Sequence, residues 1–186
     1  MSEPEITVGF INGKEFPNVL DDLETDVPGR KDYPTHINEK LSKVLVMRVG
    51  ERAVAMSRLR LEGPQPGVVA DVLQAHWPDE PTVMVDNTYT HPEFRNRNIA
   101  TAMMIILENY MMLRQDKPQR LALSVRAHQQ PAIRVYEKSK YRKLKLGDQE
   151  TFTLTVPVGD GKGGWNGEQV PSYIMAKDLS PQTKKH

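Results

Sequence analysis

The chain has no cysteine among its 186 residues. It therefore has no disulfide, no thiolate metal site and no cysteine nucleophile. Its five histidines are scattered and lack the short spacings of metal ligands. We expect a protein without a metal centre.

Long apolar segments are also missing. No run reaches the roughly 18 apolar residues of a membrane-spanning helix, and no apolar segment follows basic residues at the N-terminus. We therefore expect a cytoplasmic protein that neither crosses a membrane nor is secreted. The formal net charge is only +1, which gives no general attraction to nucleic acid.

What is present is the composition of an ordinary globular protein, with 38% hydrophobic and 26% charged residues. At this length the chain can bury one sizeable core. No internal repeat or linker is evident. The sequence predicts a single domain over residues 1–180 and a flexible tail over 181–186.

Charge is unevenly distributed along the chain. Residues 1–26 hold seven acidic residues against one lysine, whereas residues 114–145 hold ten basic residues against two acidic ones. Solvated surfaces explain such runs as well as binding sites do. The alternative is a basic half that meets a polyanionic ligand and an acidic half near a cationic one.

Hydrophobic periodicity and turn residues predict alternating strands and helices. Residues 99–114 are the best helix, apolar on nearly every side, as for a helix covered by several elements. Pro34 and Thr35 open a short helix that Thr35 caps, and residues 159–167 are glycine-rich and mobile. Further helices are expected at 15–24, 71–76 and 131–139, and strands at 6–11, 43–49, 52–61, 82–90, 120–125, 141–146, 151–158 and 172–179. This order indicates an α/β (α+β layered) domain with a mixed sheet.

The most informative segment is a strand that passes through a tight turn into the long helix. It carries the sequence Arg95-Asn96-Arg97-Asn98-Ile99-Ala100, followed by Thr101. A helix N-terminus presents unpaired N–H groups and the positive end of the helix dipole, which suits a diphosphate. Alone, the segment is equally consistent with an ordinary turn before a core helix.

A second segment lies about 30 residues further on. After a strand it places Gln129, Ala132 and Tyr136 at spacings of three and four residues, with Lys140-Tyr141 after them. Together the two segments resemble the acetyl-CoA-binding core of the GNAT superfamily of N-acetyltransferases. That family has Arg or Gln, two residues, Gly, one residue and Gly or Ala in the first segment, and Asn, Ala and Tyr in the second.

Two positions depart from the family pattern. Asn98 stands where glycine is usual, and Gln129 stands where asparagine is usual. Asparagine tolerates left-handed backbone dihedrals, so the turn can form, although its side chain narrows the approach to a phosphate. The resemblance covers about a third of the chain and implies a mixed, mostly antiparallel central sheet flanked by helices.

The resemblance also implies roles for individual residues. Tyr136 would be the general acid for the departing sulfur, and Asp86 would be a base on the strand before the turn, with Tyr89 and His91 as weaker candidates. The alternatives without a catalytic role are that the Tyr136 ring only packs on the sheet and that Asp86 is a solvated residue at the end of its strand. The residues implied in acetyl-CoA binding are Thr88, Tyr89, Thr90, Arg95, Asn96, Arg97, Asn98, Ile99, Ala100, Thr101, Gln129, Ala132 and Lys138, with Arg134 on the same helix face as Lys138.

The sequence says less about the molecule that accepts the acetyl group. In the family, the first two helices and the late strands wall its site, which here means the acidic residues 21–26 and the loop with Trp165. Acidic walls would suit the amine of a polyamine-like molecule or of a protein. The sequence thus predicts acetyl transfer from acetyl-CoA to a primary amine by direct attack in a ternary complex. A coenzyme-binding or protein-interaction module that has lost its chemistry is the alternative, and a homodimer stays open.

Overall fold

The computed structural model describes residues 5–25, 33–63, 67–78, 80–114, 120–159 and 165–179. Its strands build one eight-stranded sheet in the order β1-β2-β3-β4-β5-β8-β6, with β7 also paired to β8. All neighbours are antiparallel except β4 and β5. The expected mixed, mostly antiparallel sheet is confirmed. The strands are β1 (Ile6–Ile11), β2 (Ser42–Val49), β3 (Arg52–Arg60), β4 (Thr82–Thr90), β5 (Arg120–Arg126), β6 (Arg142–Lys143), β7 (Thr151–Gly159) and β8 (Trp165–Asp178).

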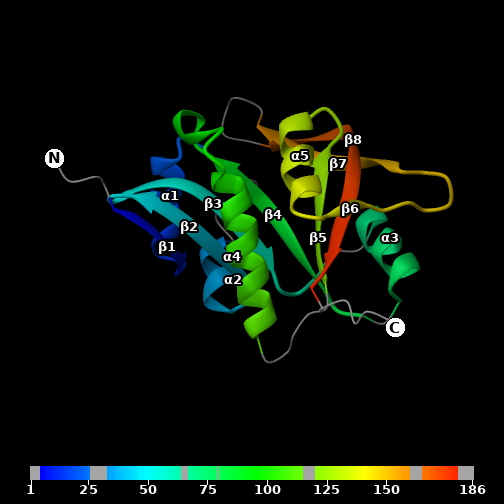
Figure 1. The fold of residues 1–186 in the computed structure, drawn as a ribbon, viewed down its shortest axis with the longest axis horizontal. Helices are drawn as coiled ribbons and strands as arrows, with labels where there is room; N and C mark the ends of the chain where they lie inside the picture. The colour runs from blue at the N-terminus through cyan, green and yellow to red at the C-terminus, as the bar shows by residue number, and fades with distance from the viewer. Residues whose placement is uncertain are drawn as a thin grey trace.

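Helices cover both faces of this sheet (Figure 1). On one face, α4 and α5 bury the largest apolar cluster, which includes Met103, Leu107, Ile133 and Tyr136. On the other face, α1 and α2 bury a second cluster and α3 buries a third. The helices are α1 (Phe16–Asp22), α2 (Tyr33–Asn38), α3 (Val68–His76), α4 (Ile99–Leu113) and α5 (Gln130–Lys138), with a 3-10 turn η1 at Pro92–Phe94.

Helix α4 is less completely covered than its composition predicts. Its buried side is centred on Met103, Met104, Leu107 and Met111, whereas Leu113 is 84% exposed. The expectation of a helix covered on several sides was therefore wrong. The helix packs on the sheet through one side, and no element among the described residues covers its outer side.

Three other expectations need correction. Helix α2 begins at Tyr33, so Thr35 lies inside it and does not cap it, because Pro34 fits a first turn that needs no N–H group. The expected strand at 141–146 shortens to β6, since Gly147 at φ 59° turns the chain into an isolated bridge between Leu146 and Gln149.

The expectation that residues 159–167 are mobile was wrong at both ends of that segment. Gly159 and residues 165–167 belong to β7 and β8, which pair from Thr151 to Gly159 with Tyr173 to Trp165. Backbone pairing, which composition does not disclose, orders both ends of that segment. Residues 160–164 and the predicted tail lie outside the described residues.

Gly13 lies in a place where the fold leaves no room for a side chain. A Cβ atom there would meet the carbonyl oxygen of Pro34 and would lie 2.8 Å from the Pro34 Cα atom, so α2 would have to shift. We expect Gly13→Ala to lower the free energy of unfolding by about 2–3 kcal/mol, as overpacking does. Chemical denaturation measures this. The control is Gly9→Ala, because nothing lies within 4 Å of a Cβ atom there; equal losses in both variants would contradict the account.

Candidate active site

The sheet opens between β4 and β5. These strands pair in parallel only from Thr82 to Met84 and from Arg120 to Ala122. Beyond that, β4 continues to Thr90 and β5 to Arg126 with no register between them in the described residues. The β4 edge from Val85 onward therefore has main-chain groups that face the opening and can bind an extended ligand.

A β-bulge interrupts β4 beside this opening. Two consecutive residues, Asn87 and Thr88, stand opposite the single residue Ser57 of β3, and the register shifts there. Asn87 adopts φ 48°, in the left-handed region that asparagine tolerates better than most residues. Such a bulge leaves one residue out of the ladder and re-aims the side chains that follow.

The bulge changes which side chains share a face of the sheet. In a regular strand Asp86 and Thr88 would point to the same side, because side chains alternate. The additional residue places them on opposite sides. Asp86 shares its side with Arg58 and Arg60, whereas Thr88 contacts Ser57 on the side that α4 and α5 cover.

On the α4 and α5 side lies a short row of hydroxyl groups. Ser57 Oγ and Thr88 Oγ1 are 2.8 Å apart, and the Thr88 hydroxyl interacts in turn with the Tyr136 phenol. Tyr136 is 9% exposed and packs edge-on against Tyr141, with ring centroids 6.1 Å apart. Burial raises the pKa of Tyr136, and the hydrogen bond with Thr88 lowers it by less. The phenol therefore keeps its proton at neutral pH, as a proton donor must.

On the other side Asp86 is held by two arginines. Its Oδ2 atom lies 2.9 Å from Arg60 and 3.8 Å from Arg58. Its Oδ1 atom is buried and has no hydrogen-bond partner among the described residues. Burial raises the pKa of Asp86 above its usual value, which the two guanidinium groups and the Arg60 hydrogen bond offset in part. Only Oδ1 is thus available to accept a proton.

The predicted phosphate turn follows β4 and η1. Asn96 and Asn98 have φ 63° and 59°, so the left-handed conformation expected of Asn98 is present. Asn98 is the N-cap of α4, and no side chain caps the helix. The first-turn N–H groups, which include those of Ile99, Ala100 and Thr101, are therefore open to a ligand, and the macrodipole favours an anion there.

The two arginines of this turn, Arg95 and Arg97, contact neighbouring residues of β4 and η1. Arg95 Nε donates to the carbonyl oxygen of Thr90 at 3.1 Å, and its guanidinium lies 5.8 Å from the Tyr89 ring centroid. The Arg97 guanidinium lies 5.3 Å from the ring centroid of Phe94. Both side chains are exposed. Arg95 thus fixes the turn against β4 and leaves its terminal nitrogens on the surface.

The second sequence segment lies across the opening. Gln129 is the N-cap of α5, and Ala132 is half-buried in the first turns of that helix. Arg134 and Lys138 are exposed on α5. The two segments predicted to bind one coenzyme thus follow β4 and β5, the two strands that diverge.

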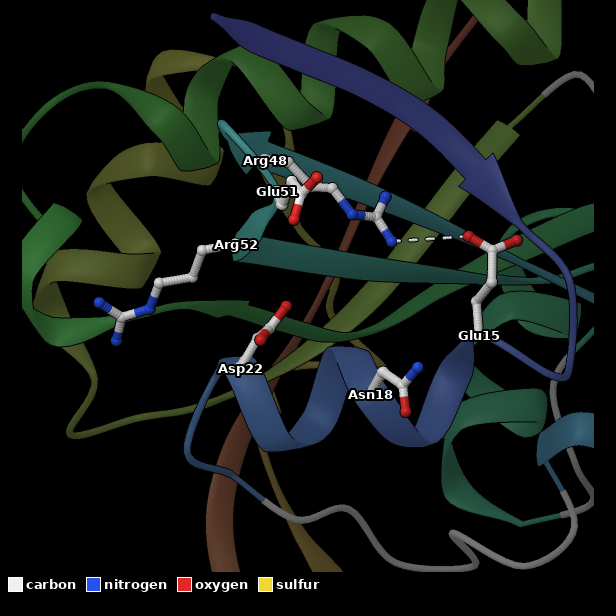
Figure 2. Close-up of a pocket in the computed structure, with 6 residues that line it drawn as sticks. All are labelled: Glu15, Asn18, Asp22, Arg48, Glu51 and Arg52. Atoms are coloured by element: carbon white, nitrogen blue, oxygen red, sulfur yellow. Dashed lines mark ion pairs between the residues drawn. The ribbon is translucent and has the colours of Figure 1, made fainter. Parts of the chain in front are cut away.

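A cleft of about 590 Å³ lies elsewhere, between α1 and the tip of the β2–β3 hairpin (Figure 2). Its charges are largely paired: Arg48 lies 3.6 Å from Glu15, and Asp22 accepts a hydrogen bond from the Ala53 N–H group. It contains no residue predicted to bind coenzyme. The residues that line it are Glu15, Asn18, Asp22, Arg48, Glu51 and Arg52.

The acidic residues within 21–26, which were predicted to line the acceptor site, are likewise paired with other groups of the protein. Asp22 binds the β3 backbone, and Glu24 lies 3.6 Å from Arg52. Asp26 lies outside the described residues, and Trp165 begins β8. The carboxylates of this region thus contact the protein itself.

Sequence reasoning missed Ser57, Arg58 and Arg60 as site residues. The sequence offered one signal, because arginines at alternate positions of a strand share a face of the sheet. In the structure Arg58 is only 6% exposed. His91 was one of the weaker candidates for the base, and its place just before Pro92 also suits a turn residue. It is that, as the N-cap of η1, but it is also buried and lies 3.0 Å from Arg52.

A sequence model of the acetyltransferase (GNAT) family matches residues 9–141, which include every predicted catalytic residue. The chain belongs to this family. The GNAT assignment identifies an acetyl-CoA-dependent N-acetyltransferase, with acetyl-CoA as the donor. No functionally curated protein matches its sequence significantly.

Solved GNAT structures share the fold at low identity. The ribosomal-protein-S18-alanine N-acetyltransferase of Escherichia coli superposes with a TM-score of 0.66 at 14% identity over 98% of this chain and 99% of that one. NAA60 of Arabidopsis thaliana in complex with acetyl-CoA gives 0.67 at 16% identity over 94% and 98%. A spermidine N-acetyltransferase chimera with Vibrio cholerae sequence gives 0.63 at 10% identity over 94% and 95%.

The opening and the turn of this GNAT protein fit its donor substrate. An extended thioester arm needs main-chain partners, which the unpaired β4 edge offers, and a diphosphate needs donors, which the uncapped α4 N-terminus offers. The described residues contain no group of three or more metal-ligating side chains. None of the described helices has the length and apolar character needed to cross a membrane.

Proposed function

We propose that this acetyltransferase transfers the acetyl group directly to a primary amine in a ternary complex, with Asp86 as base and Tyr136 as acid. The observation that carries the proposal is the bulge at Asn87. It places Asp86 on one side of the sheet and, on the other, Thr88, whose hydroxyl interacts with the buried Tyr136 phenol.

The groups on the two sides of the sheet would serve two different proton transfers, removal of a proton from the amine and protonation of the leaving sulfur. A neutral amine attacks the thioester carbonyl carbon, forming a C–N bond while the C–S bond breaks. Asp86 Oδ1 accepts the proton that the ammonium loses, directly or through water, and the Tyr136 hydroxyl donates its proton to the departing sulfur. The attacking nitrogen loses a second proton as the amide forms, and a proton returned through solvent restores the Tyr136 phenol. Main-chain N–H groups of β4 near Thr88, Tyr89 and Thr90 would polarise the carbonyl.

Direct attack also agrees with the side chains available. The chain has no cysteine to carry an acetyl group, and Tyr136 is kept protonated by burial. The raised pKa of Asp86 makes this carboxylate a stronger base than a solvated one. It also predicts that kcat/KM rises with pH at a higher pH than for an ordinary carboxylate, since the base must be ionised.

Initial-rate kinetics test the proposal. The protein is incubated with acetyl-CoA and a panel of amines, with free CoA thiol and the N-acetyl product both measured. We expect intersecting double-reciprocal plots, as for a ternary complex. Parallel plots would contradict direct attack, and stabilisation by acetyl-CoA without product from any amine would favour a module that has lost its chemistry. Saturation at 100 times the dissociation constant should add about 2.7 kcal/mol to the unfolding free energy.

A further inference from the structure

A serine interrupts the apolar side of β3 that α4 and α5 cover. Ser57 is fully buried, and its neighbours on that side of β3, Ala55 and Leu59, belong to the largest apolar cluster. Leu45, its partner across β2, belongs to the same cluster. Burying a hydroxyl group among apolar side chains costs free energy unless the group is hydrogen-bonded. The partner of this hydroxyl therefore indicates what it does.

That partner is Thr88, on the strand beside the opening. Ser57 Oγ and Thr88 Oγ1 lie 2.8 Å apart, and in the part of the chain that the structure describes Ser57 Oγ has no other hydrogen bond. The bulge at Asn87 turns the Thr88 side chain to this side of the sheet, where its hydroxyl also contacts the Tyr136 phenol. Thr88 lies on the part of β4 that has no register with β5. The three hydroxyl groups thus form a row that ends beside the opening.

The row has a direction, because each hydroxyl group has a single proton. Thr88 donates to one neighbour and accepts from the other. If Tyr136 donated to Thr88 and Thr88 to Ser57, the Ser57 proton would be left without an acceptor among apolar side chains, which is costly. In the reverse order Ser57 donates to Thr88 and Thr88 donates to Tyr136. That order uses both buried protons and leaves the phenol proton free.

We infer that Ser57 and Thr88 are positioning residues for the acid: they donate in series toward the Tyr136 oxygen and leave its proton free for the departing sulfur. As the C–S bond breaks, its electron pair stays on sulfur, which takes the phenol proton to form an S–H bond. The phenolate that remains accepts a charge-assisted hydrogen bond from Thr88, which the donation from Ser57 strengthens. This inference rests on the proposed function, because it uses Tyr136 as the acid.

Single variants measure the contribution of each hydroxyl. Thr88→Val keeps the side-chain shape, and we expect kcat to fall about tenfold or more with the KM for acetyl-CoA unchanged, as for loss of a hydrogen bond to a charged group. Thr88→Ser should retain most of the activity, and Ser57→Ala should lower kcat by a smaller factor. Ser172→Ala is the matched control and should leave kcat unchanged. Ser172 is also buried on a strand and makes one side-chain hydrogen bond, 3.2 Å from the Val170 carbonyl oxygen, outside the row.

A double-mutant cycle shows whether Thr88 acts through Tyr136. Once Tyr136→Phe has removed the phenol, Thr88→Val should lower kcat by less than about twofold further, since residues that act as a unit are not additive. An equal loss from Thr88→Val with and without the phenol would overturn the inference. The Thr88 hydroxyl would then serve the coenzyme or the fold and not the acid.

A titration separates this inference from the proposed function. Fluorine NMR of the protein made with difluorotyrosine, whose phenol ionises at lower pH than that of tyrosine, follows the phenols without catalysis. The chain has six tyrosines, and the Tyr136 signal is the one that Tyr136→Phe removes. We expect Thr88→Val to raise the pKa of this phenol by about one unit, because its ionised form loses a donor. Tyr141 packs on the Tyr136 ring in both proteins, so its effect cancels.

The titration and the kinetics together give distinct outcomes. If the pKa of Tyr136 shifts but Tyr136→Phe leaves kcat unchanged, the row orients the phenol as inferred and the proposed acid fails. If Tyr136→Phe lowers kcat but Thr88→Val shifts nothing, the inference fails and the proposed acid stands.

Discussion

Replacing Tyr136 with phenylalanine is expected to lower kcat by about 10²- to 10⁴-fold, the range that general acid–base catalysis contributes. The phenol is the buried hydroxyl on the α5 side of the opening, and burial keeps it protonated. Removing its oxygen leaves the ring and its packing. The leaving sulfur would then depart without a proton donor. Stopped-flow or steady-state measurement of CoA release, with the acetyl-CoA dissociation constant measured in parallel, checks this.

Tyr141→Phe is the matched control. It removes the same atom from the neighbouring ring, 6.1 Å away between centroids, and that hydroxyl is also buried. Burial and the nearby Glu108 carboxylate raise the pKa of Tyr141 well above the usual value, so it too stays neutral. We expect kcat to change by less than about threefold in this variant, far below the catalytic range. Equal losses in both variants would assign the effect to packing and not to proton transfer.

Most of the fold was predictable because the strands and the long helix follow local rules. The apolar run Val83-Met84-Val85 marked a buried strand, and the observed β4 has the expected bounds. Gly50 at φ 61° closes the β2–β3 hairpin at the predicted position. Periodicity and turn chemistry act within a few residues, so one sequence discloses them.

What the sequence did not disclose depends on distant partners. Glu108 lies on the buried side of α4 because Lys177, 69 residues away on β8, is 2.6 Å from it. The extended β8 strand likewise depends on pairing with β7. Local patterns carry no information on such contacts, which is why the two ends of the glycine-rich segment were misread as mobile.

The candidate site likewise has features that are local in the sequence, which could be predicted, and features that depend on strand pairing, which could not. The turn at residues 95–98 and the spacing of Gln129, Ala132 and Tyr136 were readable, since each is a continuous segment. The bulge at Asn87 was not, because it exists only as a register between β3 and β4. The pairing of Arg58 with Asp86 was missed for the same reason, because the two residues become partners only when β3 and β4 align.

The N-terminus of α4 offers the most direct way to block the donor site. Replacing Ala100 with glutamate would place a carboxylate among the first-turn N–H groups, at a half-buried position. At about 5 Å and an effective dielectric constant near 20, each like-charge pair costs about 3 kcal/mol, so we expect acetyl-CoA to bind at least about 100-fold more weakly. Isothermal calorimetry with acetyl-CoA measures the loss.

Stability should change in the opposite direction, which separates this effect from unfolding. A carboxylate in the first turn complements the helix dipole and adds about 0.3–1 kcal/mol, so the melting temperature without ligand should stay or rise. Ile105→Glu places the same charge on the same helix at a 49% exposed position and should leave coenzyme affinity unchanged. If Ala100→Glu instead bound acetyl-CoA as tightly as the wild type, the diphosphate would have to lie away from the α4 N-terminus.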